Sequence, residues 1–160
     1  MNKSAIVQSI IAKLTYELER YAASAKAAHA EATHEQSKAE NKYDTRGLEA
    51  SYLAHGQSKQ AAEVEQARAD YEVLKLREFT AETPIDLTAL VELTANGERC
   101  FYFIGPRAGG TEVEQAGHEI LTITPQSPLG RELIGKKVGD RFHVGLALNR
   151  RVDYAIISVW

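Results

Sequence analysis

The first half of the chain carries a heptad of apolar residues that restricts it to paired helices. Apolar side chains recur at alternating spacings of three and four residues, which is the pattern of a coiled-coil seam. The seam consists of Val7, Ile11, Leu14, Leu18, Tyr21, Ala25, Ala28, Ala32 and Ala39, and only Glu35 interrupts it. Large residues begin the seam and alanines end it, and alanines let packed helices approach closely. We therefore expect a helix of roughly 40 residues, about 60 Å long, that is thin at its far end.

The helical pattern breaks between Tyr43 and Gly47, and a second seam follows. A glycine inside a helix costs about 1 kcal/mol, and aspartate and threonine favour helix caps. The second seam consists of Ala50, Leu53, Gln57, Gln60, Val64, Ala67, Tyr71 and Leu74. It mirrors the first, because small or polar residues lie near the break and large ones lie far from it. The pattern predicts an antiparallel helical hairpin over residues 1–79 with its tip near 43–49. The alternative is one long helix in a dimeric coiled coil.

The composition changes near residues 80–84, which indicates a domain boundary. All 4 prolines and most glycines, valines and isoleucines follow this point. Asn96-Gly97 is a strong hairpin signal, and Asn149-Arg150 is a second turn. Residues 107–110 read as a flexible loop. The expected strands cover residues 87–94, 99–104, 119–124, 141–148 and 152–159. Roughly five strands and one helix predict a compact α+β domain over residues 84–160 with a curled antiparallel sheet.

One segment, ITPQSPLGRELIGKKVGD from Ile123 to Asp140, reads as a strand end, a short capped helix and a turn. Ser127 can accept hydrogen bonds from the first amides of the helix, and Pro128 lies where a missing N–H does no harm. Gly135 can supply a left-handed stop, and Gly139-Asp140 turns the chain. The expected buried face of this helix consists of Leu129, Leu133 and Ile134.

This segment closely resembles the C-terminal domain of the bacterial Gre transcript-cleavage factors. Members of that family read Ser-Pro, four residues, then Leu-Ile-Gly-Lys, followed by a Gly-Asp or Asp-Asp turn. A long helical hairpin precedes this domain in the family, as it is predicted to do here. The Gre C-terminal domain is similar to the FKBP fold, so the resemblance implies an FKBP-like antiparallel β domain with one short helix.

The resemblance implies a role in transcription. The family's hairpin enters the secondary channel of bacterial RNA polymerase, and acidic residues at its tip help hold the second Mg²⁺ of the polymerase. The polymerase then hydrolyses the 3′ end of backtracked nascent RNA. Such a factor has no cofactor of its own and is not itself the enzyme. In this chain the resemblance assigns that role to Asp44, with Glu49 assisting.

The tip differs from the family pattern in its spacing. The family reads Asp-x-x-Glu-Asn and then a tyrosine, which Tyr52 matches. The two acids of this chain, Asp44 and Glu49, are five residues apart instead of three. Tyr43, Arg46 and Tyr52 are the further candidates for contacts at the tip. Asp44 is equally explained as a helix cap, and Glu49 as an acid that complements the helix dipole.

The resemblance also places a polymerase-docking site on the β-rich domain. The family docks through residues around the Ser-Pro helix start, which here are Ser127, Pro128 and Leu129. Helix capping and core packing explain the same three residues without docking, and a core position explains Leu129 better than docking does.

The remaining sequence excludes several other classes of function. A net charge of −3 argues against a general nucleic-acid binder. Cys100 is the only cysteine, which fits a reducing cytoplasm, and no apolar run predicts a signal peptide or a membrane span. The five histidines do not have the spacing of a metal site.

Three alternatives remain open at this level. A factor with the altered tip spacing could occupy the secondary channel and regulate or inhibit transcription without cleavage. An FKBP-like fold could serve a folding helper, although the only tryptophan, Trp160, ends the chain. The third is a plain coiled-coil oligomer.

Overall fold

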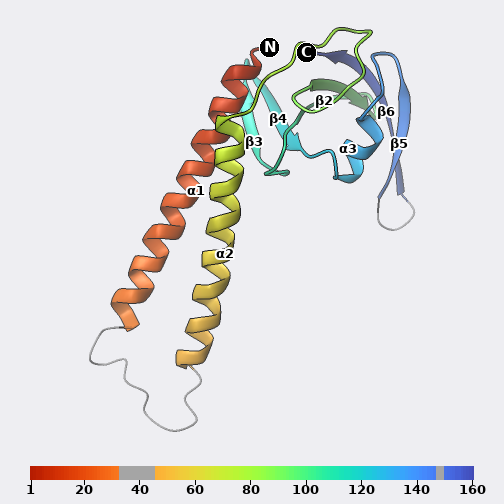
Figure 1. Cartoon of the computed structure of the whole chain (residues 1–160). Coiled ribbons are helices and arrows are strands. Elements are labelled where there is room, and N and C mark those ends of the chain that lie inside the picture. The colour runs from red at the N-terminus through yellow and green to blue at the C-terminus, as the bar shows by residue number, and fades with distance from the viewer. Residues whose placement is uncertain (33–45, 147–149) are drawn as a thin grey trace. The chain divides into compact units, whose positions relative to one another are not determined.

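The computed structural model describes residues 1–32, 46–146 and 150–160, with side chains over 1–28, 55–145 and 151–160. The chain forms two compact units, each drawn in Figure 1. One unit is Ala12–Arg68. The other combines Met1–Ile11 with Ala69–Trp160, so it draws on both ends of the sequence. The composition change near residues 80–84 falls in the connection between the last helix of the hairpin and the first strand.

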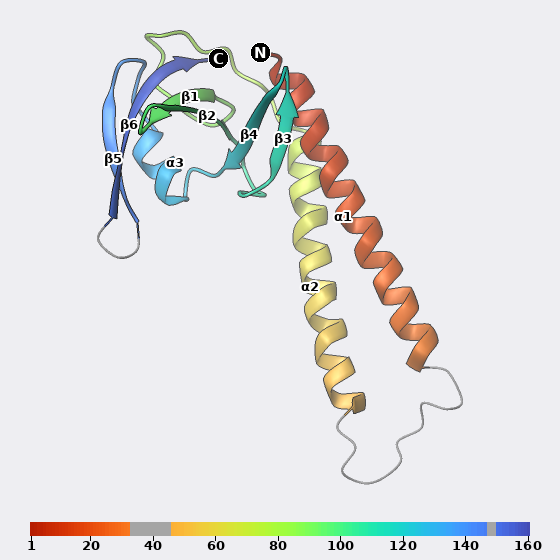
Figure 2. The ribbon, with the colours of Figure 1, turned by 180° about the vertical axis from the view of Figure 1, so that it is seen from behind.

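Two long helices form the predicted hairpin, and they run side by side in Figures 1 and 2. Helix α1 spans Lys3–Ala32 and helix α2 spans Arg46–Glu72. The Tyr21 hydroxyl lies 3.4 Å from Gln60 Oε1, and Gln57 Nε2 lies 3.5 Å from Ser24 Oγ. The residue number rises along α1 as it falls along α2, so the helices are antiparallel. Because these contacts join two segments of one chain, they confirm the hairpin and contradict the alternative of one long helix.

The buried side of α1 differs by one residue from the predicted seam. Ile6 and Ile10 are fully buried, whereas the predicted Ile11 is half-buried. The first turns of α1 belong to the same compact unit as the sheet, and a globular core covers a wider stripe of a helix than a coiled-coil partner does. On α2, Ala61 is half-buried and the predicted Gln60 is exposed.

Burial within the hairpin decreases along α1, as the mirrored seams predict. Leu14 is buried, Leu18 and Tyr21 are half-buried, and every residue from 22 to 28 is exposed. On α2, Ala67 and Tyr71 are buried, whereas the described residues nearer its start are exposed or half-buried. The distal part of the described hairpin is therefore two helices with little shared core.

Six strands form one mixed sheet, one strand more than predicted. The strands are β1 (Leu90–Ala95), β2 (Glu98–Ile104), β3 (Glu112–Gln115), β4 (His118–Ile123), β5 (Arg141–Leu146) and β6 (Arg150–Val159). Their order is β3-β4-β2-β1-β6-β5. Neighbours are antiparallel except β2 and β4, which run parallel. The expectation of a wholly antiparallel sheet is wrong at this pair, because β3 takes the outer position and β4 returns between β3 and β2.

The missed strand β3 has four residues and joins β4 through an unusual turn. Ala116 and Gly117 have φ values of 53° and 74°. This backbone suits a two-residue hairpin, but alanine rarely signals it. The predicted Asn96-Gly97 turn is confirmed, with φ values of 53° and 84°. Of the other predicted turn, Asn149 lies outside the described residues.

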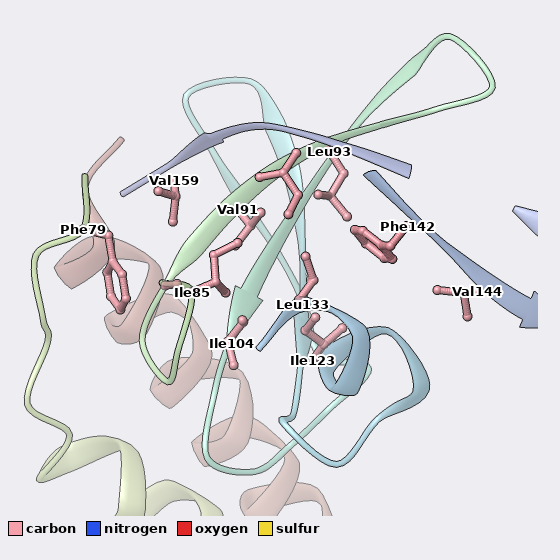
Figure 3. Packing of buried hydrophobic residues seen from close by; sticks show 12 residues of the cluster. Phe79, Ile85, Val91, Leu93, Ile104, Ile123, Leu133, Phe142, Val144 and Val159 are labelled. Atoms are coloured by element: carbon pink, nitrogen blue, oxygen red, sulfur yellow. The ribbon is translucent and has the colours of Figure 1, made fainter. Parts of the chain in front are cut away.

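Apolar side chains cover both faces of the sheet. One face packs under the short helix α3, Pro128–Leu133 (Figure 3). Its cluster includes Ile85, Val91, Leu93, Ile104, Ile123, Leu133, Phe142, Val144, Ile156 and Val159. The opposite face carries Phe101, Phe103 and Ile120, all buried. This arrangement is the predicted α+β fold. No helix within the described ranges is long and apolar enough to cross a membrane.

Candidate functional site

Ser127 caps helix α3 as the sequence predicts. It has extended backbone (φ −64°, ψ 156°), and its Oγ accepts a hydrogen bond from Gly130 N at 3.0 Å. The same hydroxyl donates to the carbonyl oxygen of Thr124 at 2.8 Å. Because one side chain joins the strand end to the helix start, the backbone around Ser127 is fixed on both sides.

The residues after Ser127 divide between surface and core. Pro128 occupies the first turn of α3 and is exposed. Leu129 is half-buried against the cluster under the helix. Gly130 is buried, and a Cβ at this position would lie 2.0 Å from the carbonyl oxygen of Thr124. This close approach of strand end and helix requires glycine.

The end of α3 is tied to the segment that precedes β1. Gly135 has a φ of +85°, which is the predicted left-handed stop. Its N–H donates to the carbonyl of Ile85 at 2.8 Å, and Ile85 N–H donates to the carbonyl of Lys136 at 2.8 Å. Ile134 is exposed at 37%, so its predicted place on the buried face is wrong. The helix ends at Leu133, and Ile134 has already left the helical backbone.

The exposed surface of α3 is small, rigid and chemically mixed. Pro128 and Ile134 present apolar surface, while Arg131 and Glu132 present opposite charges. None of these groups is arranged as a nucleophile with a base. The geometry of α3 suits contact with another protein surface, since rigid exposed apolar groups with a polar rim are typical of interfaces.

The tip residues are placed only in part. Tyr43 and Asp44 lie outside the described residues. Arg46, Glu49 and Tyr52 lie in the first two turns of α2, where the backbone is described and the side chains are not. The structure therefore brings Ser127, Pro128 and Leu129 together and leaves the arrangement of the tip acids open.

A junction between the end of α2 and the β-rich part of the chain was not predicted. The Tyr71 hydroxyl donates to the carbonyl of Arg107 at 2.9 Å, and Arg107 Nε lies 2.6 Å from Asp70 Oδ2. Gly105 lies so close that a Cβ there would be 1.9 Å from the Tyr71 oxygen. Burial raises the pKa of Tyr71 well above its ordinary value. The loop at Arg107 was expected to be flexible, but these contacts fix it, and no local pattern in the sequence indicates them because Asp70 and Tyr71 are distant in the sequence.

Metal-ligating side chains do not gather in the part of the chain that the structure describes. No group of three or more His, Cys, Asp or Glu residues there could hold a metal ion. Cys100 is half-buried.

Comparison with known proteins gives one family match. Residues 85–160 match the family model described as transcription elongation factor, GreA/GreB, C-terminal. No curated protein matches the chain.

Solved structures also resemble the chain. Gfh1 of Thermus aquaticus is 23% identical, with 95% of this chain and 94% of that chain covered and a TM-score of 0.40. The GreA factor homolog 1 of Thermus thermophilus is 22% identical over 94% of each chain, with a TM-score of 0.39. A GreA/GreB elongation factor from Nitrosomonas europaea is 18% identical over 74% of this chain and 94% of that chain, with a TM-score of 0.38. Similarity at these scores supports no conclusion about function.

The family match covers the whole sheet and the Ser127-capped helix, and the hairpin precedes it. Residues 85–160 of this chain are therefore a C-terminal domain of the GreA/GreB family of transcription elongation factors.

Proposed function

We propose that the protein binds RNA polymerase through its secondary channel and stimulates cleavage of backtracked RNA. The observation that carries this proposal is the family match over residues 85–160, joined to a helical hairpin ahead of it. Membership of this family implies RNA polymerase as the partner. The nascent RNA would be contacted through the polymerase, at its 3′ end.

The described hairpin has the shape that such a role needs. Helix α1 has 30 residues, and those from 22 to 28 are all exposed. At 1.5 Å per residue, 30 residues extend about 45 Å. Two helices with little shared core form a slender element that can enter a narrow channel.

The proposed chemistry belongs to the polymerase, and this chain contributes carboxylates. Asp44 and Glu49 would supply oxygen ligands to a Mg²⁺ ion of the polymerase active centre, where two-metal catalysis activates the attacking oxygen and stabilises the leaving one. Arg46 lies between the two acids in the sequence and can contact a phosphate. Tyr43 and Tyr52 flank the same segment and would contact the surrounding polymerase.

Docking would use the surface of α3. Ser127 holds the helix start rigid, Pro128 offers exposed apolar surface, and Leu129 supports both from the core. A preorganised docking surface loses little conformational entropy on binding.

Cleavage of RNA in purified backtracked polymerase complexes tests the proposal. The wild-type protein should accelerate cleavage, and Asp44→Asn should reduce that acceleration on the order of tenfold or more, because it replaces a charged carboxylate ligand with a neutral amide. Glu49→Gln should have a smaller effect. Glu63→Gln is the matched control, since Glu63 is exposed in the middle of α2. Equal acceleration by wild type and Asp44→Asn would remove Asp44 from the mechanism.

A second function is favoured by the spacing of the tip acids. Asp44 and Glu49 are five positions apart in the sequence, whereas the acids of the family pattern are three positions apart. A tip that cannot position its acids could still occupy the channel and inhibit transcription. Promoter-dependent transcription measured beside the cleavage assay separates the two functions: inhibition by both wild type and Asp44→Asn, without cleavage by either, would establish the second.

A further inference from the structure

One edge of the sheet is open along strand β5. The strand order places β5 at the end of the sheet, beside β6 only, and Figures 1 and 2 show it as the outermost strand. Within the described ranges, no backbone hydrogen bond joins residues 141–145 to any strand or loop other than β6. An edge strand of this kind has unpaired N–H and C=O groups along its free side, which can pair with another extended chain.

Positive side chains gather on one face of this edge. The register pairs Arg141 with Ala155, His143 with Asp153, and Gly145 with Arg151. Directly opposed residues share a face, so Arg141, His143, Arg151 and Asp153 lie on the same side. All four are exposed, while Phe142 and Val144 between them are buried in the core. Among described residues, neither arginine has an ion-pair partner.

A cleft of about 500 Å³ lies beside this face. Polar side chains from three strands and one turn line it, among them Thr94, Asn96, Arg141, His143, Asp153 and Tyr154. The guanidinium, amide and hydroxyl groups in this set can all donate hydrogen bonds to a carboxylate. The cleft and the free strand edge therefore offer two kinds of contact at one place.

We propose that β5 and this cleft bind an extended acidic segment of a protein partner. The segment pairs with the backbone of β5 as an added strand and places alternate carboxylates against Arg141 and Arg151. In this mode of recognition the backbone supplies affinity and the alternate side chains supply specificity. A carboxylate matches the fork of an arginine, which makes an acidic segment the best complement.

The charges at this edge disfavour the other occupants. A second copy of the chain paired along β5 would set the cations of one edge against those of the other, which destabilises cross-strand neighbours. A nucleic-acid strand carries a phosphate at each nucleotide, and the Asp153 carboxylate would repel it. A peptide can instead place a backbone amide or a cation beside Asp153. The rings of Phe142 and Tyr154 stack with their centroids 5.4 Å apart, and Phe142 is 8% exposed. The Phe142 ring is therefore not available for stacking with nucleic-acid bases.

Titration of the ¹⁵N-labelled 160-residue chain with a synthetic peptide tests the inference and needs no polymerase. The probe is a blocked six-residue peptide that alternates valine and glutamate, and its comparison peptide replaces each glutamate by glutamine. We expect saturable shifts of the amide signals of β5, weaker at high salt. The glutamine peptide should bind roughly fivefold more weakly, because each exposed ion pair contributes modestly.

Charge-reversed variants locate the contact. Arg141→Glu and Arg151→Glu should each weaken binding of the acidic peptide severalfold, and two variants guard against one that fails to fold. Arg20→Glu is the matched control, because it makes the same charge change at an exposed position on α1. Unchanged binding by both edge variants, or shifts that map away from β5, would overturn the inference.

The remaining occupants are tested in the same experiment. A single-stranded oligonucleotide of ten thymidines that shifts the β5 signals at lower concentration than the acidic peptide would overturn the proposal in favour of phosphate binding. Sedimentation of the peptide-free protein that shows a dimer abolished by Arg141→Glu would overturn it in favour of a second copy. No shift with millimolar acidic peptide would equally overturn it.

Discussion

At the scale of single residues, close backbone approaches fix the surroundings of the candidate docking helix. Gly130 leaves no room for a side chain beside the carbonyl of Thr124, and Gly105 leaves none beside the Tyr71 hydroxyl. The sequence does not show which group each glycine approaches, and only the packing shows why glycine is needed there. Such sites are sensitive to single methyl groups because protein interiors are close-packed.

Replacement of Gly130 by alanine should destabilise the domain. The new Cβ would lie 2.0 Å from the Thr124 carbonyl oxygen, so strand and helix must separate. We expect a loss of about 1–3 kcal/mol in the free energy of unfolding, measured by urea denaturation. Gly145→Ala is the control, because nothing lies within 4 Å of its added Cβ. Equal stability of the two variants would contradict the packing described here.

Tyr71 should make stability depend on alkaline pH. Burial raises its pKa above the ordinary value of 10.0, so between these two values the unfolded chain loses a proton that the folded chain keeps. The contribution of Tyr71 to the free energy of unfolding should therefore be fully present below about pH 10 and decrease above it. Tyr71→Phe should lower the free energy of unfolding by about 1 kcal/mol at neutral pH, because it removes the hydrogen bond to the Arg107 carbonyl, and should flatten the alkaline decline.

Urea midpoints at neutral pH and above pH 10 check this prediction. The stability of Tyr71→Phe should still decrease somewhat at alkaline pH, because burial also raises the pKa of Tyr102. Tyr16→Phe is the control, since Tyr16 is 64% exposed. A decline as steep in Tyr71→Phe as in the control would contradict the role given to Tyr71.

At the scale of elements, the sequence predicted the helices and turns whose signals are local. Two helices, the capped α3 and the Asn96-Gly97 hairpin follow from periodicity and capping residues, which act locally. Strand β3 was missed because a four-residue strand with one buried side chain, Val113, has too little alternation to be seen. The seam included Ile11, whereas Ile10 is the buried residue, because the first turns of α1 belong to a compact unit whose other residues are distant in the sequence.

The candidate site was predictable in the same uneven way. The local roles of Ser127 and Pro128 follow from cap chemistry, and the structure confirms them. Their role in docking depends on a partner and stays a prediction, as do the roles of Asp44 and Glu49. Arg107 could not be predicted, because its partner Asp70 lies 37 residues away and no local pattern links them.

Capping and docking by Ser127 can be separated. Ser127→Ala removes the acceptor for Gly130 N–H and should cost about 1 kcal/mol of stability. Ser127→Asp keeps an acceptor and should recover most of that loss. Co-purification with core polymerase measures docking for the same two variants. Retained binding by Ser127→Asp and lost binding by Ser127→Ala would indicate that the cap matters through its rigidity.

Helix α2 should gain stability from the loss of a glycine. Gly56 lies in the helix interior, and nothing lies within 4 Å of an added Cβ. Gly56→Ala should stabilise the helix by up to about 1 kcal/mol through lower backbone entropy of the unfolded chain. Circular dichroism during thermal unfolding measures the gain, and an unchanged or lower midpoint would contradict an open environment at Gly56.

At the scale of the whole molecule, the two compact units differ in how much they bury. The described residues of Ala12–Arg68 include few buried ones, whereas the unit with the sheet has buried apolar residues on both faces of the sheet. Local stability follows buried apolar contact. Amide hydrogens of residues 15–28 should therefore exchange faster than those of β1 and β2, as measured by mass spectrometry of deuterated peptides. Equal protection would show that the hairpin is held by something other than its seam.

The unit that contains the sheet is assembled from both ends of the sequence, since Met1–Ile11 join Ala69–Trp160. On the ribosome the first turns of α1 are made long before the rest of this unit, so Ile6 and Ile10, which are buried in the folded protein, stay exposed until residues 69–160 have been synthesised. A fragment cut at the boundary near residues 80–84 would lack these side chains, together with Tyr71, and would expose apolar surface to solvent. Dissection of this protein into two soluble pieces therefore requires that the opening residues of the chain be supplied to the second piece.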